Sequence, residues 1–158
     1  MLALVLAACN KDEKHTPDRP EPIIEDTVKQ YSYWTVNEDS FSTNQVVANT
    51  YRSPGNALAV LRATDSVNNF EIYFTHLSRF PQSGDFPLQD SSIHYPVSGV
   101  GVYFLYHSTS YFIAYPTDHH LSAASVNGKG QYTLPPTWFY SYYHPEDSVL
   151  ISGTFNEP

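Results

Sequence analysis

Two pairs of adjacent carboxylates are the residues of this chain whose types could support acid–base catalysis. The pairs are Glu38-Asp39 and Glu146-Asp147. Glycoside hydrolases use two carboxyl groups, one as the acid and the other as the base or nucleophile. Each pair lies in a turn-like segment, beside Asn37 or Pro145, and polar residues in turns are usually solvated. The chain also lacks a Gly-x-Ser-x-Gly nucleophile elbow and a phosphate-binding glycine loop. We therefore expect a protein that is not an enzyme.

A second cluster with chemical potential is Asp118-His119-His120, whose residue types can bind metal ions. Adjacent histidines on a strand point to opposite faces, so both could bind one ion only if they lay in a loop. A closed zinc site also needs about four ligands, and no further ligand stands at a recognisable spacing. We expect a polar turn after Tyr115-Pro116 and no metal or cofactor.

Aromatic residues are unusually frequent, with 13 Tyr, 9 Phe and 2 Trp in 158 residues. They are densest in the segment Thr137–Tyr143. Strict alternation along a strand would place Trp138, Tyr140 and Tyr142 on one face, and Tyr143 with the residues between them on the other. Such an all-aromatic face either packs in a core or interface, or forms a flat platform on which sugar rings stack. We predict that one aromatic face of this strand turns away from the core, with Trp138, Tyr140 and Tyr142 as candidate ligand-binding residues.

Cys9 is the only cysteine of the chain and follows a short apolar run that begins at Leu2. The run is far shorter than the roughly 20 residues that a membrane-spanning helix needs. The residues Leu6-Ala7-Ala8-Cys9 resemble the lipobox of bacterial lipoproteins, where the signal peptide is cleaved and the cysteine is acylated. The resemblance implies a cleaved signal peptide over residues 1–8 and a lipid anchor in the bilayer at Cys9.

The residues after the cysteine carry a second resemblance. Lys11-Asp12-Glu13 is similar to the export signal of Bacteroidetes-type surface lipoproteins, which implies an outer-membrane protein that faces the cell exterior. Residues 9–30 are rich in proline and charged side chains and contain little that is apolar. Such a segment cannot bury enough surface to offset its ordering entropy. We interpret it as a flexible tether between the anchor and the folded part.

The charge of the chain argues against nucleic acid as a partner. The full sequence has 8 Lys and Arg residues against 16 Asp and Glu, which gives a net charge of -8. From residue 31 onward the basic side chains are only Arg52, Arg62, Arg79 and Lys129. Nucleic-acid binding needs a basic patch, and scattered basic residues on an acidic protein do not supply one.

Residues 31–158 have the size and the pattern of a single all-β domain. Short runs rich in β-branched and aromatic residues alternate with Pro, Gly, Asn and Asp, as in sandwiches and barrels. The pattern predicts an antiparallel β-sandwich or partly open barrel of about eight to ten short strands, with little or no helix. The strands are expected near 31–36, 41–48, 57–63, 70–77, 100–107, 111–115, 121–126, 131–134, 137–143 and 149–155.

Alternation and turn chemistry refine this expectation. Phe70, Ile72 and Phe74 share one face and should point into the core, whereas Val102–Tyr106 is apolar on both faces and should be covered on each side. Asn127-Gly128 favours a tight hairpin, because both residues tolerate positive φ angles. Turns are also expected at Asn68-Asn69, Pro54-Gly55-Asn56 and Ser83-Gly84-Asp85.

The C-terminal part carries a third resemblance. Gly128–Leu134 and Ser148–Phe155 look like the closing strands of a family of uncharacterised Bacteroidetes lipoproteins, which are small β-proteins of unknown function. The motif Ser152-Gly153-Thr154-Phe155 has a structural explanation, since a glycine there permits a bulge or a close backbone approach beside an inward aromatic side chain.

Two hypotheses for the function follow from the sequence. The first is a non-catalytic surface lipoprotein whose β-domain binds a glycan or a partner protein. The alternative is an accessory cell-surface hydrolase, such as a glycoside hydrolase. An exposed, flat aromatic patch would favour the first hypothesis, and a cluster of buried carboxylates in a cleft would favour the second.

Overall fold

The computed structural model describes residues 30–53, 56–90, 99–113 and 117–158. The expected signal peptide, the expected lipid anchor at Cys9, the expected export signal Lys11-Asp12-Glu13 and nearly all of the expected tether lie outside these residues. Two residues of the expected turn at Pro54-Gly55-Asn56 lie outside them as well. Within the described residues the fold is all-β without a helix, as the sequence predicted. The strands are β1 (Ser32–Val36), β2 (Asp39–Thr43), β3 (Val46–Ser53), β4 (Asn56–Thr64), β5 (Asn69–Thr75), β6 (Gly84–Gln89), β7 (Val100–Tyr106), β8 (Thr109–Phe112), β9 (His120–Val126), β10 (Lys129–Ser141) and β11 (Ser148–Asn156).

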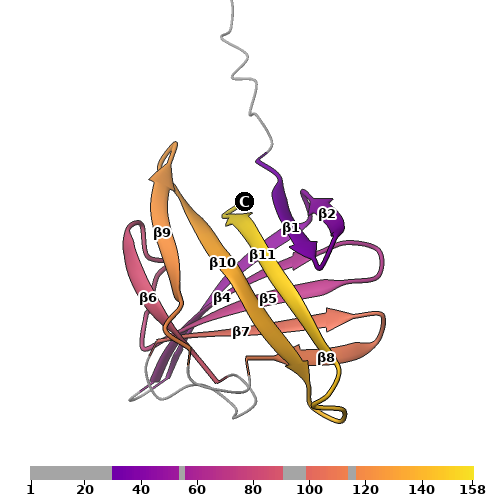
Figure 1. Ribbon diagram of the computed structural model, residues 1–158. Coiled ribbons are helices and arrows are strands. Elements are labelled where there is room, and N and C mark those ends of the chain that lie inside the picture. The colour runs from indigo at the N-terminus through magenta and orange to yellow at the C-terminus, as the bar shows by residue number, and fades with distance from the viewer. Residues whose placement is uncertain (1–29, 54–55, 91–98, 114–116) are drawn as a thin grey trace, which may run out of the picture.

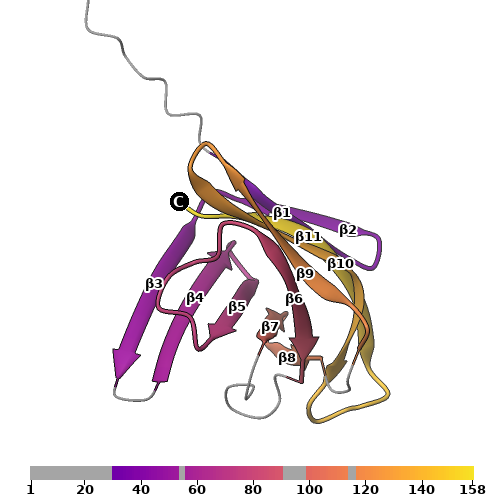
Figure 2. The same cartoon turned by 90° about the vertical axis from the view of Figure 1, so that its left-hand side faces the viewer.

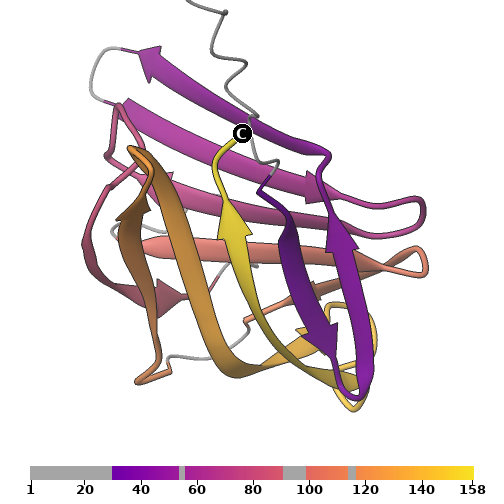
Figure 3. The same ribbon diagram turned by 90° about the horizontal axis from the view of Figure 1, so that it is seen from above.

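All eleven strands belong to one sheet with the order β2-β1-β11-β10-β9-β6-β7-β5-β4-β3, and β8 pairs with both β7 and β10. Every pairing is antiparallel except that of β6 with β7. The sheet folds over so that β9, β10, β11, β1 and β2 form one layer and β3, β4, β5 and β7 form the other (Figures 1 and 2). Seen from above, the strands of the two layers run across each other (Figure 3).

Two short strands join the layers. β6 lies between β9 and β7, and β8 lies between β7 and β10, so hydrogen-bonded neighbours close a ring of β10, β9, β6, β7 and β8. The remaining strands extend the sheet beyond this ring on both sides, and for that reason the fold is not a regular barrel. The outer surface of the sheet is therefore continuous from one layer to the other across β6 and β8.

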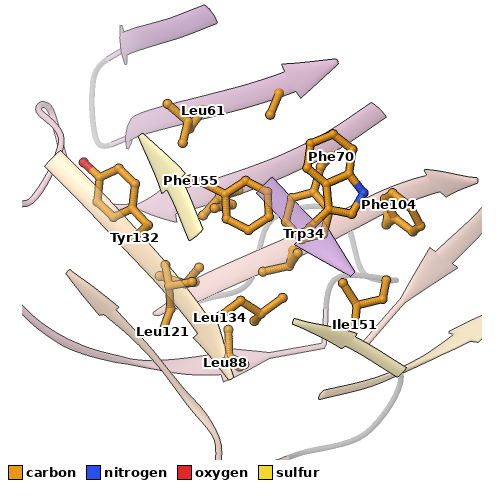
Figure 4. Close-up of a cluster of buried hydrophobic side chains, with 14 of the residues drawn as sticks. Trp34, Leu61, Phe70, Leu88, Phe104, Leu121, Tyr132, Leu134, Ile151 and Phe155 are labelled. Atoms are coloured by element: carbon orange, nitrogen blue, oxygen red, sulfur yellow. The ribbon is translucent and has the colours of Figure 1, made fainter. Parts of the chain in front are cut away.

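The core lies between the layers and is rich in aromatic side chains (Figure 4). Phe70, Ile72 and Phe74 of β5 are fully buried, which confirms the alternation read from the sequence. The ring of Phe70 stacks on that of Phe155 from β11, with centroids 4.2 Å apart, and lies 6.3 Å from the ring of Trp34 in β1. Aromatic contacts therefore connect the two layers directly.

β10 is one strand where two were expected, and Pro135-Pro136 sits within it. The register with β11 shifts between Leu134 and Thr137, which marks a bulge, and the Thr137 hydroxyl donates to the carbonyl of Pro135 at 2.8 Å. Proline has no N–H with which to donate to a neighbouring strand. At a bulge the hydrogen-bond ladder is already interrupted, so a proline is tolerated there. Before the bulge β10 pairs with β9, and after it with β8, so the prolines stand where the strand changes its partner.

The prediction of a single strand over residues 41–48 was wrong. β2 ends at Thr43 and β3 begins at Val46, because the Thr43 hydroxyl donates to the carbonyl of Thr64 and accepts from the amide of Gln45. β3 then continues to Ser53, beyond the predicted end. Its last residues are exposed because β3 is an edge strand, and exposure removes the apolar alternation by which strands are recognised.

The sequence predicts a turn at Ser83-Gly84-Asp85 and no strand over β6, which contains Pro87, a residue without an N–H to donate. In the structure Gly84 and Asp85 pair with β9, and Pro87 lies opposite His120. Two features let this strand form despite the proline: its parallel pairing with β7 covers only two residues, and the amide of Leu88 donates to the carbonyl of His119. The described residues therefore form eleven strands, where about eight to ten were expected.

Both glycine-containing motifs have the geometry expected for their residues. Asn127 and Gly128 have φ angles of 53° and 77° and form the two-residue turn between β9 and β10, which confirms the predicted hairpin. A Cβ atom on Gly153 would lie 2.7 Å from the carbonyl oxygen of Tyr33 and 2.8 Å from the Cβ of Trp34. Gly153 therefore permits the close approach of β11 to β1.

Candidate functional site: an outer aromatic strip and an adjoining hollow

The aromatic segment of β10 alternates between the core and the outer surface. Phe139 is fully buried, whereas Trp138 is 51% exposed and Tyr142 is 61% exposed, with Tyr140 half-buried on the same outer side. One aromatic face of this segment therefore lies outside the core. Tyr143 is also exposed, so its predicted place on the inner face was wrong. The reason is that β10 ends at residue 141, and alternation does not continue past its end.

Two further aromatic side chains continue this outer face onto the neighbouring strands. Phe112 of β8 lies opposite Tyr140 of β10 and also opposite Tyr103 of β7. Its ring centroid is 5.3 Å from that of Tyr103 and 6.0 Å from that of Tyr142. We call Tyr103, Phe112, Trp138, Tyr140 and Tyr142 the outer strip.

Sequence reasoning missed Tyr103 and Phe112. It predicted that the segment containing Tyr103 is covered on both faces, but Tyr103 and Leu105 are only half-buried while Val102 and Phe104 are fully buried. The outer side of β7 is therefore a surface. Phe112 could not be grouped with Tyr140 from the sequence because nothing local shows that β8 bridges two strands of different layers.

The predicted carboxylate pairs lie in exposed turns. Glu38 belongs to the turn between β1 and β2, and Asp39 follows it at the start of β2; both are exposed. Glu146 and Asp147 are exposed between β10 and β11. The hydroxyl of Tyr111 donates to Asp147 at 2.9 Å; burial, with a further contribution from this hydrogen bond, raises the pKa of Tyr111 to about 12. Asp147 thus serves as the hydrogen-bond acceptor for the hydroxyl group of a buried tyrosine.

Asp118, His119 and His120 are all exposed at the start of β9. The Nδ1 atom of His119 lies 3.0 Å from the hydroxyl of Thr137, and that of His120 lies 3.1 Å from the backbone carbonyl of Asp118. In the described part of the chain, no three His, Cys, Asp or Glu side chains are grouped so that they could hold a metal ion. The local contacts of this segment are those of a polar turn.

A hollow of about 560 Å³ lies on the outer face of β3, β4 and β5, and sequence reasoning did not find it. Its lining includes Leu58 and Val60 of the middle strand, Tyr51 from β3 and Tyr73 from β5. Val60 is buried although its neighbours in β4, Ala59 and Leu61, are the ones that point into the core. Its burial on the outer side shows that the flanking strands shelter this part of the surface.

One end of the hollow is organised by Glu71, a buried carboxylate that is 6% exposed. It accepts hydrogen bonds from Arg62 Nε at 2.5 Å, from Asn69 Nδ2 at 3.0 Å and from the hydroxyl of Tyr73. A buried carboxylate needs such partners, since an unpaired charge is costly to bury. Glu71 therefore fixes the positions of Arg62 and Tyr73.

The hollow and the outer strip are neighbours on one surface. Glu71 of β5 lies directly opposite Tyr103 of β7, and Arg62 of β4 lies directly opposite Glu71. Both residues of each pair point outward, because their chain neighbours point into the core. A continuous row of outward side chains thus runs from Arg62 through Glu71, Tyr103 and Phe112 to Tyr140. Figure 1 shows the strands β4, β5, β7, β8 and β10 that carry these residues.

The described residues include no helical segment that could span a membrane.

Comparisons of the chain with protein-family models, with curated proteins and with solved structures find no match.

Proposed function

We propose that this protein is a non-catalytic, surface-anchored lipoprotein whose β-domain binds a glycan through the outer strip. The observation that carries the proposal is the outward position of Trp138, Tyr140 and Tyr142, together with Tyr103 and Phe112 beside them. Exposure of these aromatic rings to water costs free energy. An exposed apolar patch of this kind is typical of an interaction site.

A glycan suits the chemistry of this surface. Aromatic rings pack against the C–H face of a sugar, while tyrosine hydroxyls stay in water or bond to sugar hydroxyls. A row of rings on three adjacent strands can contact several sugar units in succession. The rival hydrolase hypothesis has less support, since both predicted carboxylate pairs lie in exposed turns and the buried Glu71 is held by three donors.

Removal of the exposed rings should weaken glycan binding without destabilising the fold. We expect Trp138→Ala and Tyr142→Ala each to lower the affinity for a bound polysaccharide by at least about tenfold, which corresponds to the loss of roughly 1.4 kcal/mol of contact. The free energy of unfolding should change by less than about 0.5 kcal/mol, because both side chains are on the surface. Affinity electrophoresis against a panel of polysaccharides, with urea denaturation of each variant, measures both quantities.

Tyr31→Ala is the matched control, because Tyr31 is as exposed as Trp138 but does not belong to the outer strip. Phe139→Ala should instead cost about 3–5 kcal/mol of stability, since Phe139 is the fully buried neighbour of Trp138. The proposal fails if the unmodified chain binds no polysaccharide of the panel, or if neither strip variant binds more weakly than the unmodified chain. Shortening of the polysaccharide during incubation would support the hydrolase alternative.

We propose that Lys11-Asp12-Glu13 acts as the export signal that brings the protein to the cell surface. We expect conversion of these three residues to alanine to leave the protein in the membrane fraction but to hide it from protease added to intact cells. Immunoblotting of protease-treated cells measures this, and conversion of Asp18, Arg19 and Glu21 to alanine is the control for removing three charges from the same segment. Equal cleavage of all three forms would show that the export signal lies elsewhere.

A further inference from the structure

We infer that the hollow on the outer face of β3, β4 and β5 binds the carboxylate-bearing unit of an acidic glycan. This inference rests on the proposed glycan-binding function and names the class of glycan. It combines three properties of the described residues: the concentration of arginine in the hollow, the mixed apolar and polar lining, and the continuity of the hollow with the outer strip.

The first property is charge. From residue 31 onward the protein carries ten carboxylates and only four Lys or Arg side chains, yet two of these four line the hollow. Arg62 points outward beside Glu71, and Arg52, which lies opposite Ala57, borders the hollow near the end of β3. Glu71 is the only carboxylate among the described lining residues, and it is paired with Arg62. No carboxylate in the described ranges forms an ion pair with Arg52. The hollow is therefore a positive site on a protein that is otherwise acidic.

The second property is the donor geometry. Arg62 uses its Nε atom for Glu71, and its side chain remains 48% exposed, so a ligand in the hollow can reach this arginine. A guanidinium group binds a carboxylate through two parallel hydrogen bonds. Because Glu71 holds Arg62 in place, the arginine is ordered before a ligand arrives, and less entropy is lost on binding.

The third property is the shape and lining of the hollow. A volume of about 560 Å³ lies within the range of small-molecule sites. Leu58 and Val60 offer an apolar floor for the C–H face of a sugar ring, and Tyr51 and Tyr73 offer rings with hydroxyl groups. A uronic acid presents this combination of a carboxylate, several hydroxyls and an apolar ring face. An inorganic anion would use only the arginines.

Continuity with the outer strip gives the hollow its place in the glycan site. Glu71, at the end of the hollow, lies opposite Tyr103, which is the first ring of the strip. A chain of sugars stacked on the strip can thus place one acidic unit in the hollow. The strip supplies affinity for rings in general, and the hollow supplies the preference for a carboxylate.

The test uses the full chain with Cys9→Ser, which removes the acylation site, titrated calorimetrically with oligogalacturonate and with neutral cello-oligosaccharide of equal length. We expect the acidic oligomer to bind about tenfold more tightly at low salt. Arg52→Gln should lower this preference about threefold, because it removes one of the two arginines and leaves Arg62 in place. Arg79→Gln removes the same charge outside the lining of the hollow and should have no effect. The preference should weaken as salt rises, since exposed ion pairs are screened.

The outcomes separate this inference from the proposed function. Equal binding of the two oligomers, or equal effects of the Arg52 and Arg79 variants, would overturn the inference and leave the glycan-binding function standing. If neither oligomer binds, the proposed function fails for these glycans, and the hollow is tested alone with glucuronate, glucose and acetate by amide chemical shifts of Tyr51 and Tyr73. Shifts that only glucuronate causes, and that Arg52→Gln weakens, would keep the inference. No shifts, or equal shifts with acetate, would overturn it.

Discussion

Replacement of Cys9 by serine is expected to release the protein from the membrane completely. Cys9 is the only cysteine, so no other thiol can accept an acyl chain in its place. Each buried methylene of an acyl chain contributes about 0.8 kcal/mol, and a second chain converts marginal attachment into stable anchoring. Loss of all chains should therefore move the protein from the membrane pellet to the soluble fraction, as fractionation and immunoblotting would measure.

The alanine variant of Lys11-Asp12-Glu13 is the matched control for this experiment, because it changes the same segment but keeps the thiol. Metabolic labelling with an alkyne fatty acid gives a second readout that does not depend on fractionation. Continued labelling of the Cys9→Ser variant, or its retention in the membrane pellet after a carbonate wash, would contradict acylation at this residue.

Replacement of Phe70 by alanine is expected to cost about 3–5 kcal/mol of the free energy of unfolding, as for other fully buried phenylalanines. Phe70 is fully buried, and its ring contacts those of Trp34, Phe104 and Phe155. These partners come from both layers, so a cavity here weakens the contact between the layers as well as the packing of β5. The cost is a large share of the roughly 5–15 kcal/mol that stabilises a typical domain.

Equilibrium urea denaturation, followed by circular dichroism, measures this effect. Tyr33→Ala is the control, because Tyr33 is about half exposed and removes an aromatic ring of similar size from the surface; its effect should stay within about 0.5 kcal/mol. A loss of less than 1 kcal/mol for Phe70→Ala would show that the two layers do not depend on this aromatic cluster.

The sequence alone determined the features of this protein that depend on neighbours along the chain. Period-two alternation marked Phe70, Ile72 and Phe74 as inward, because consecutive side chains of a strand must point to opposite sides. Asn127-Gly128 predicted its hairpin because those residues accept positive φ angles. The lipobox and the export signal are also local patterns, and they remain predictions because they lie outside the described residues.

Local patterns failed where a strand's environment, and not its composition, decided its conformation. The end of β3 is exposed on an edge and has lost the usual alternation, and β6 tolerates Pro87 because its pairing with β7 covers only two residues. In the same way, sequence analysis grouped Trp138, Tyr140 and Tyr142 on one face, but it could not decide whether that face was covered.

The packing of the two layers determines which surfaces stay open and which distant residues meet on them. Alternation assigns side chains to two sides of a strand, but the position of the second layer determines which side becomes the core. Because β8 pairs with both β7 and β10, Tyr103, Phe112 and Tyr140 form one row. Because β4 pairs with β5 in one particular register, Arg62 meets Glu71. These contacts depend on strand pairing between the layers and on exact register, neither of which a local pattern encodes.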